Sequence, residues 1–424
     1  MLKFVLQLGV ERRRAVIYRM QCVTKCQRAL PAALSAATRR RQTEIYVHDF
    51  QPLGNNTFEK AVADVDEFDC KVKIVSGAGT VSRLADFGAR RLFLVTDPFF
   101  YKNGVARQVA AASRAEQVEF FHDVRPDPTV ELAAEGTARL KAFGADLIVA
   151  LGGGSAMDCA KAMAFFAKED MKLVAIPTTS GSGSEVTDFA ILTHNKVKHP
   201  LVDKRLRPCM AILDSDLLQE MPPSLIADAG FDVLAHAVES YVATGAGAFS
   251  DMLAQEAFRS AYGALPASFA GHKEVRLKVH LAATMAGMAF TEAGLGLCHA
   301  MAHALGGMFH VAHGKLNAVL LPSVVATNAH VAGAKYAQLA RVCGMGGTAD
   351  TIAVRNLRNN LVRLRRELKL PETLAQAGIA PGALRSATNE IVKATLDDPC
   401  CRTNPMKIED FLVRRILEEV TGRV

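Results

Sequence analysis

The fold is decided by residues 147–164, which read LIVALGGGSAMDCAKAMA. The apolar run at 147–151 favours a buried β-strand, and the alanine-rich run after the glycines is typical of a helix. Glycines let the backbone approach a ligand, and the amides at a helix N-terminus favour an anion such as pyrophosphate. A glycine triplet alone is equally explained by the steric needs of a tight turn, so the phosphate interpretation needs support from elsewhere.

Support comes from a second small, polar loop. Residues 177–185, PTTSGSGSE, follow another apolar strand-like run at 173–176. Two such loops at strand ends would line one crevice of an open parallel sheet. Asp97 ends a further apolar run, where its carboxylate would accept from a ribose hydroxyl and repel a 2′-phosphate, which favours NAD over NADP. The alternative is a turn aspartate before Pro98.

On both sides of residues 147–164 the same alternation continues. Strand-like runs at 72–75, 92–95, 118–121, 147–151 and 173–176 alternate with helical stretches such as 130–142. This alternation predicts an α/β domain with a parallel sheet. After Pro222-Pro223 the strand signal disappears and periodic helical stretches follow. We therefore expect a dinucleotide-binding α/β domain at 69–222 and an all-α, metal-binding domain at 223–424, after an extension at 1–68.

The helical half carries candidate metal ligands at helical spacing. Asp232 and His236 are four residues apart, as are His299 and His303, so each pair would project from one face of a helix. His313 follows a glycine pair, and we expect it to return from a turn or loop. A carboxylate with imidazoles suits zinc, iron or another first-row ion. Spacing alone leaves open which of the five are ligands.

These motifs, in this order, resemble those of the iron-activated (group III) alcohol dehydrogenases, from about Lys71 to the C-terminus. The resemblance rests on the glycine-rich run at 152–161, the loop at 177–187, Gly230-x-Asp232-x3-His236 and the run from His299 to Gly314. Details at 293–303 and 402–405 are most similar to the 1-propanol and ethanol dehydrogenases of bacterial microcompartments. The fold that this family implies is the dehydroquinate synthase-like one, with the active site in the cleft between its two domains.

The resemblance implies a role for each candidate residue. Asp232, His236, His299 and His313 would ligate the metal, usually Fe²⁺, with Zn²⁺ as the alternative. His303 would instead lie near the nicotinamide and relay a proton. The residues implied in NAD(H) binding are Asp97, Gly152, Gly153, Gly154, Ser155, Asp158, Thr178, Thr179, Ser182 and Lys198.

The expected reaction is the reduction of a short-chain aldehyde, propionaldehyde or acetaldehyde, by NADH to the primary alcohol. The metal would act as a Lewis acid on the carbonyl oxygen. Three alternatives remain open: a lactaldehyde or propane-1,2-diol oxidoreductase, an NAD- and metal-dependent lyase resembling dehydroquinate synthase, and an inactive relative kept for docking. We also expect a homo-oligomer.

Charge and composition restrict the other partners. Residues 1–41 carry ten Lys or Arg and one Glu, whereas the rest of the chain has 40 basic and 42 acidic residues. The catalytic body is therefore not basic, and nothing in it suggests nucleic acid. No apolar run approaches the roughly 18 residues of a membrane span. The nine cysteines are scattered and odd in number, which favours a reduced compartment, the cytoplasm, over a disulfide framework.

The basic extension has three interpretations. It is a tail that docks on a microcompartment shell or a partner enzyme, an arginine-rich organellar presequence, or a leader from an upstream start codon with Met20 as an alternative beginning. A secretory signal is disfavoured, because three arginines follow the short apolar stretch at once.

Overall fold

The computed structural model describes residues 68–167, 171–194 and 197–422. The interpretations of the basic extension at 1–67 lie outside these residues. Residues 66–424 form one compact unit. The predicted domain boundary at residue 222 therefore stays a prediction.

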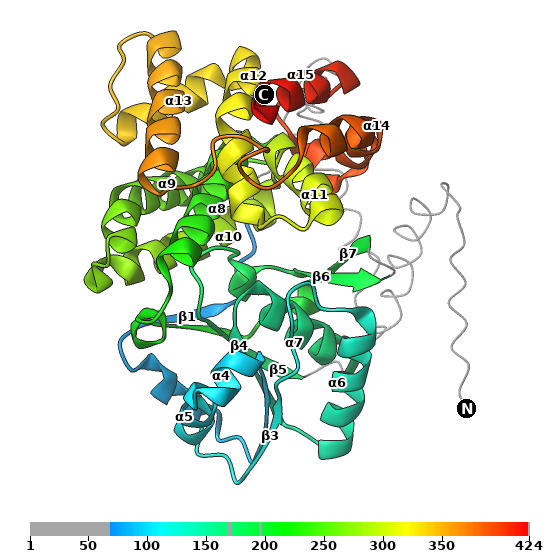
Figure 1. Ribbon diagram of the computed structural model, residues 1–424. Coiled ribbons are helices and arrows are strands. Elements are labelled where there is room, and N and C mark those ends of the chain that lie inside the picture. The colour runs from blue at the N-terminus through cyan, green and yellow to red at the C-terminus, as the bar shows by residue number, and fades with distance from the viewer. Residues whose placement is uncertain (1–67, 168–170, 195–196, 423–424) are drawn as a thin grey trace, which may run out of the picture. The chain divides into compact units, whose positions relative to one another are not determined.

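The first half of this unit contains a six-stranded parallel sheet (Figure 1). Its strand order is β1-β8-β5-β4-β2-β3. The strands are β1 Lys73–Gly77, β2 Arg91–Val95, β3 Gln117–Phe121, β4 Leu147–Gly152, β5 Lys172–Pro177 and β8 Met210–Asp214. The parallel sheet and the first five strands confirm the prediction. Strand β8 was not predicted, although its run at 210–213 is as apolar as the runs of the predicted strands.

Both faces of the sheet are buried. Along β4, residues 147, 149 and 151 pack with the helical turns η1 (Thr80–Phe87) and α5 (Val105–Ala112). Residues 148 and 150 pack on the other face with α6 (Val130–Phe143) and α7 (Gly154–Ala167). Because helices cover both faces, β4 is apolar at every position before its glycine.

Two further strands form a separate antiparallel pair, β6 (Phe189–His194) with β7 (Val197–Val202). Helix α7 packs beneath β6. The pair was not predicted, and it extends from the loop that follows β5.

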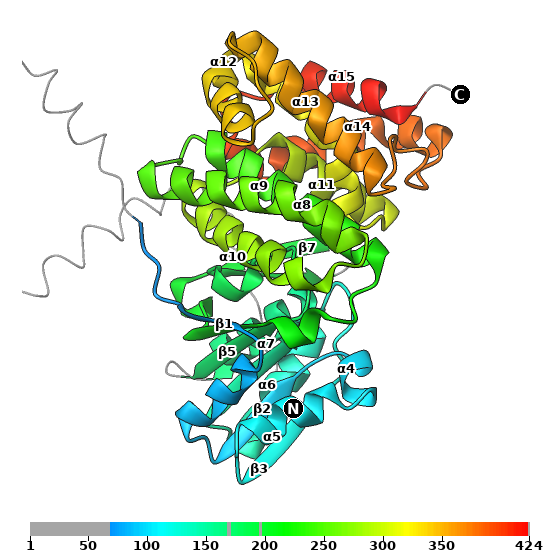
Figure 2. The same ribbon diagram turned by 90° about the vertical axis from the view of Figure 1, so that its left-hand side faces the viewer.

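The second half is helical, as predicted, with no strand among described residues 223–422. Its helices are α8 Pro223–Val242, α9 Ala248–Phe269, α10 Arg276–Ala293, α11 Leu297–Phe309, α12 His313–Val342, α13 Asp350–Glu367, α14 Pro381–Asp397 and α15 Asp410–Thr421. The buried α12 lies among α8, α11, α13 and α15 (Figure 2).

By length and hydropathy alone, α12 would pass as a membrane span, and α10 with α11 would pass only as a pair bent by 103°. In α12, 72% of the most apolar window is buried inside the protein. This burial is typical of the core helix of a globular domain.

Helix α10 connects the helical half to the loop after β5. Gly183 in that loop approaches Gly287 of α10 so closely that a Cβ on Gly183 would lie 2.7 Å from the Gly287 Cα. Ser180 in the same loop hydrogen-bonds His280 of α10 at 3.0 Å. Nearby, the Arg276 guanidinium donates to the carbonyls of residues 218 and 219, which precede α8.

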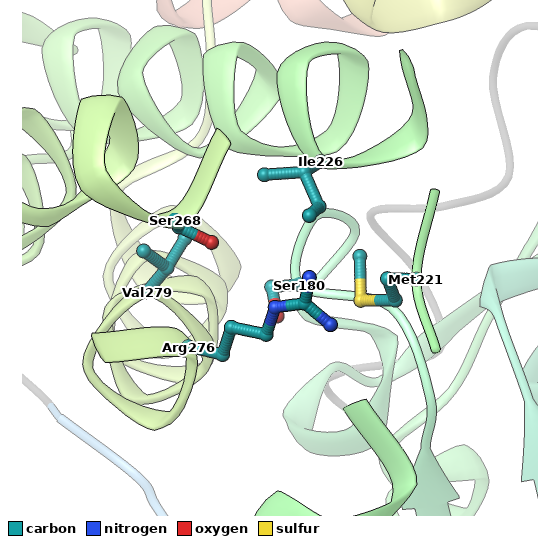
Figure 3. Close-up of a pocket in the computed structure, with 6 residues that line it drawn as sticks. All are labelled: Ser180, Met221, Ile226, Ser268, Arg276 and Val279. Carbon is teal, nitrogen blue, oxygen red and sulfur yellow. The ribbon is translucent and has the colours of Figure 1, made fainter. Parts of the chain in front are cut away.

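A small cavity lies at this junction (Figure 3). It is lined by Ser180, Met221, Ile226, Ser268, Arg276 and Val279. No predicted metal ligand lines it, so the cavity belongs to the junction and not to the predicted metal site.

Candidate functional site

One carboxylate and two imidazoles, from three helices, converge at one point. Asp232 lies on α8, His299 on α11 and His313 at the start of α12. The Asp232 Oδ1 atom is 3.7 Å from His299 Nε2 and 3.6 Å from His313 Nε2. These separations exceed a hydrogen bond and are close to the roughly 3.4 Å expected between two ligands of one tetrahedral ion at about 2.1 Å. The donor set therefore fits a divalent first-row metal.

His236 and His303 lie beside this group. The His236 ring stacks on the His299 ring with centroids 4.5 Å apart, one turn along α8 from Asp232. The His303 ring stacks on the His313 ring at 5.2 Å. Neither contributes to the group of Asp232, His299 and His313, whose ligand atoms lie within 4.8 Å of one another. Their separate roles, His236 as ligand and His303 as relay, stay predictions.

The chain does not break where we expected, at the glycine pair Gly306-Gly307; the turn before His313 comes later. Helix α11 continues through Gly306 and Gly307 to Phe309. The break falls at His310, whose φ of 54° is left-handed, and His313 is the first residue of α12. A glycine inside a helix costs only about 1 kcal/mol relative to alanine, which the packing of the residues before the pair, buried up to Leu305, offsets.

Behind the metal candidates, Glu239 of α8 organises the start of α11. This carboxylate is 2% exposed and accepts from the backbone amides of Gly296, Cys298 and His299. It also pairs with His299 Nδ1 at 2.7 Å. Glu239 thus caps a helix N-terminus and fixes the His299 ring, so that Nε2 faces Asp232.

Two asparagines complete this support. Asn317 of α12 donates to Asp232 Oδ1 at 2.7 Å. Asn404, in the segment before α15, accepts from the Leu297 amide at 3.1 Å. The backbone amides of residues 296–299 are therefore all bound by two side chains, Glu239 and Asn404.

The electrostatics of the group favour a cation. Burial would raise the pKa of Asp232, but its interactions with His236, His313 and His299 outweigh this and lower that pKa well below its usual range. Burial lowers the pKa of His236 to about 4 and that of His313 well below its ordinary value. For His299 burial is outweighed by contacts with Asp232 and Glu239, which raise its pKa to about 9. A metal ion would replace the proton that His299 carries at neutral pH.

The two predicted coenzyme loops lie side by side. Strands β4 and β5 are paired so that Gly152 opposes Pro177, which brings both strand ends together. A Cβ on Gly153 would lie 3.2 Å from Thr179 Oγ1, and one on Gly154 would lie 3.2 Å from Ser182 Oγ. Helix α7 begins at Gly154, so its free amides point toward this junction.

The remaining candidates in these loops differ in exposure. Ser155 lies in the first turn of α7 and is partly exposed. Thr178 is 2% exposed, and its Oγ1 has no hydrogen-bond partner among the described residues. The coenzyme role of each stays a prediction.

Asp158 faces the protein. Its carboxylate accepts from Ser184 Oγ at 2.9 Å and from the Ile191 amide at 3.2 Å. Lys161, one turn further along α7, is fully buried and donates to Ser184 Oγ, Thr187 and the Phe189 carbonyl. The two residues therefore anchor the loop after β5 to α7.

Asp97 and Lys198 are engaged in other contacts. Asp97 Oδ1 accepts from the amides of residues 99 and 100, so it caps α4 (Pro98–Lys102). This contact agrees with the alternative interpretation of Asp97, a turn aspartate before Pro98. Lys198 of β7 pairs with Asp127 at 2.7 Å and is 40% exposed. Neither contact excludes a coenzyme role, which stays a prediction for both.

Comparison with known proteins identifies the family. The model of iron-containing alcohol dehydrogenases matches residues 71–215, and that of the C-terminal part of the same family matches residues 226–421. The chain belongs to the iron-containing alcohol dehydrogenase family. The resemblance found in the sequence is therefore confirmed.

Individual relatives agree. A 1-propanol dehydrogenase of Salmonella typhimurium, PduQ, is 36% identical over 369 residues, which cover 84% of this chain and 100% of the relative. An NADPH-dependent butanol dehydrogenase of Clostridium saccharobutylicum is 34% identical, with 81% and 95% covered. The structure of an iron-containing alcohol dehydrogenase from Thermococcus thioreducens aligns with a TM-score of 0.78 at 32% identity, over 84% of this chain and 99% of that one.

The sequence motifs of this dehydrogenase did not predict the supporting roles of Glu239, Asn317 and Asn404. Glu239 had a usable signal, because it lies seven residues after Asp232, in a stretch that is apolar apart from His236, and so shares its helix face. The asparagines had no signal, since their partners are 85 and 107 residues distant. All seven cysteines among the described residues are free.

Proposed function

We propose that this dehydrogenase uses NADH and a divalent metal, Fe²⁺ or Zn²⁺, to reduce short unsubstituted aldehydes, propionaldehyde and acetaldehyde, to primary alcohols. The observation that carries the proposal is the convergence of Asp232, His299 and His313 with Glu239 behind them. Packing alone does not require two buried carboxylates and two imidazoles at one point. A metal site does, because it needs its ligands and also a carboxylate that orients a ligating histidine.

Bound metal would supply Lewis-acid polarisation of the aldehyde carbonyl, and NADH would supply the hydride. Asp232, His299, His313 and His236 would hold the ion. Glu239 keeps the proton of neutral His299 on Nδ1, which leaves Nε2 free to ligate. Asn317 holds the Asp232 carboxylate by one oxygen, so that its position is fixed before a metal arrives.

His303, held by Asp398, would deliver the proton that the product alcohol needs. Asp398 Oδ2 lies 2.9 Å from His303 Nδ1. Burial would raise the pKa of Asp398, but its hydrogen bond with His303 outweighs this and lowers the pKa. Asp398 is therefore ionised and accepts the Nδ1 proton, so Nε2 is the atom of His303 that exchanges a proton. Asp398 is a positioning residue in this scheme.

The coenzyme would lie over the loops after β4 and β5. Gly153 and Gly154 leave room for the pyrophosphate beside Thr179 and Ser182. The N-terminus of α7 would stabilise its charge. The second carboxylate oxygen of Asp97, the one that does not cap α4, would select NAD(H) over NADP(H), whereas the 34% identical relative is an NADPH-dependent butanol dehydrogenase.

The aldehyde is proposed from the relatives. The 36% identical relative is a 1-propanol dehydrogenase, which supports propionaldehyde. A lactaldehyde reductase of Escherichia coli, 33% identical, supports lactaldehyde as the second candidate. These relatives are dehydrogenases or reductases, so the lyase alternative gains no support.

The test is NADH oxidation by anaerobically purified protein loaded with Fe²⁺ or Zn²⁺. Substrates are acetaldehyde, propionaldehyde, lactaldehyde and glyceraldehyde, and Asp232→Ala is the control. Metal-dependent turnover of the unsubstituted aldehydes that the control loses is expected. Preference for lactaldehyde would select the second candidate, and silence on all four, with metal and NADH bound, would refute both.

We also propose that the chain forms a homo-oligomer and that its basic extension docks on a microcompartment shell or a partner enzyme. The charge of residues 1–41 and the similarity to microcompartment dehydrogenases support the docking role. Light scattering of the full chain tests the oligomer. Co-sedimentation with shell protein, lost when residues 1–68 are deleted, tests the docking, and an unchanged sedimentation would favour the leader or presequence.

A further inference from the structure

A second group of potential metal ligands lies next to the first. It consists of His303 on α11, Asp398, and Cys400 in the 3-10 turn η6 (Pro399–Thr403). One ligand atom from each lies within 4.8 Å of the others. Asp398 joins the group, since Oδ2 pairs with His303 Nδ1 and Oδ1 accepts from the Cys400 amide at 2.8 Å.

The three donors differ in kind and together suit zinc. An imidazole nitrogen, a carboxylate oxygen and a thiolate sulfur are the ligand types that Zn²⁺ takes in proteins, usually with tetrahedral geometry. One thiolate and one carboxylate neutralise the charge of a divalent ion, which lowers the cost of holding it in a half-buried place. Three protein ligands leave the fourth position for water.

We propose that His303, Asp398 and Cys400 form a second metal site, which binds Zn²⁺ and thereby inhibits the dehydrogenase. The inhibitory part rests on the proposed function, through the role of His303 in proton transfer. The binding part rests only on the three donors.

The site is accessible and adjoins the catalytic group. The His303 side chain is 39% exposed, whereas that of Asp398 is 14% exposed. The His303 ring lies against that of His313, so the second ion would bind beside the first set of ligands. Zinc can therefore reach the site from solvent without passing through the first set.

Zinc binding would stop proton exchange by His303. Cys400 ligates zinc as the thiolate, so its thiol proton must be released when the ion binds. On binding, the thiol proton leaves to solvent, and the imidazole proton moves from Nδ1 to Nε2 as Nδ1 becomes a ligand. The ring then has no free lone pair, so it can no longer accept a proton at neutral pH.

The binding test uses Co²⁺ as a spectroscopic substitute for zinc. A thiolate ligand gives cobalt an intense charge-transfer absorption in the near ultraviolet, and the predicted catalytic ligands include no thiol. Titration of metal-free full-length protein should show two bound Co²⁺ per chain, with the thiolate absorption belonging to one of them. Cys400→Ser should bind one and lose that absorption.

The neighbouring cysteine supplies the control. Cys401 Sγ donates to the Thr395 carbonyl at 3.0 Å and is absent from the ligand group. Cys401→Ser should therefore keep both ions and the absorption. A wild-type protein without the absorption at saturating cobalt, or Cys400→Ser that retains it, would overturn the proposal. Asp398→Asn, which should also lose the absorption, guards against misfolding of the serine variant.

The inhibition test follows turnover as zinc is added to enzyme whose catalytic site is already filled. Wild type should lose activity by about tenfold or more, because general acid–base steps contribute about 10²–10⁴-fold. The activity of Cys400→Ser is expressed relative to its own rate without zinc. Half-inhibition of this variant should need a zinc concentration roughly tenfold or more above that for wild type, because the loss of even a supporting residue weakens metal binding by that much. Equal inhibition of both would refute the inhibitory role. The cobalt spectrum needs no turnover, so an intact absorption without aldehyde reduction would count against the proposed function alone.

Discussion

Replacing Glu239 by glutamine should weaken both metal binding and the fold of the helical half. The carboxylate accepts four hydrogen bonds, three on Oε2 and one, from the Cys298 amide, on Oε1. In the best case, the carbonyl oxygen of glutamine takes the place of Oε2 and keeps its three hydrogen bonds. The side-chain NH₂ group then faces the Cys298 N–H, and the hydrogen bond on Oε1 is lost. Loss of one charge-assisted bond costs about 1.5–3 kcal/mol, and loss of the charge at the α11 N-terminus about 0.3–1 kcal/mol.

We therefore expect the free energy of unfolding of metal-free Glu239→Gln to fall by about 2–4 kcal/mol. Zinc affinity should fall about 10–100-fold, as for other residues that orient a ligating histidine. Unfolding is followed by circular dichroism, because the chain has no tryptophan. Affinity is measured by competition with a chromophoric chelator.

The same substitution should change the pH dependence of metal binding. Burial would lower the pKa of His299, but contacts with Asp232 and Glu239 raise it to about 9. Zinc must displace that proton, so wild-type affinity should rise with pH up to about 9 and then level off. In Glu239→Gln the pKa is lower, and the rise should end at lower pH.

A matched control is Glu390→Gln, which changes an exposed glutamate on α14. It should alter unfolding by no more than about 0.5 kcal/mol. If Glu239→Gln binds zinc as tightly as this control and unfolds at the same denaturant concentration, then Glu239 does not hold His299, and the reasoning fails.

The other predictions test separate parts of the site. His299→Ala should abolish aldehyde reduction with little loss of NADH binding, measured by fluorescence titration; parallel loss of both would argue against separate sites. Asp398→Asn should lower kcat by about 10²-fold or more with little change in KM for NADH, because His303 loses its orienting acceptor; a change confined to KM would contradict this. Gly152 has φ 148°, so Gly152→Ala should cost about 1–3 kcal/mol of unfolding free energy, and an unchanged denaturation midpoint would show that no strain arises. Burial lowers the pKa of Lys161 to about 8, despite neighbouring carboxylates. Below pH 8 the folded state therefore disfavours the charged amine. This cost disappears as the pH rises from 8 to about 10.5, so the free energy of unfolding of wild type should rise by about 3 kcal/mol relative to that of Lys161→Met. Equal pH profiles of the two proteins in urea unfolding would contradict this.

The parts of the fold that sequence could predict are those with a local pattern. Strands β1 to β5 are short runs rich in apolar residues, and α8 and α11 have ligand candidates four residues apart. These features depend on neighbours a few positions away, so the sequence reports them directly.

What the sequence could not predict depends on distant partners. Asn404 caps α11 from 107 residues away, and Asp398 meets His303 across 95 residues. The break before His313 falls at His310 because the local cost of a glycine pair is smaller than the gain from buried packing around α11. Each outcome is decided by tertiary contacts that no short pattern contains.

The contacts of residues 398–404 have a consequence for the order in which the site can form. Asp398 holds His303 and Asn404 binds the first turn of α11, although these partners are 95 and 107 residues apart along the chain. Until residues 398–404 have been synthesised, α11 lacks one of its two caps and His303 lacks its partner. The site therefore cannot take its final form while only the helices that carry its candidate metal ligands have been made.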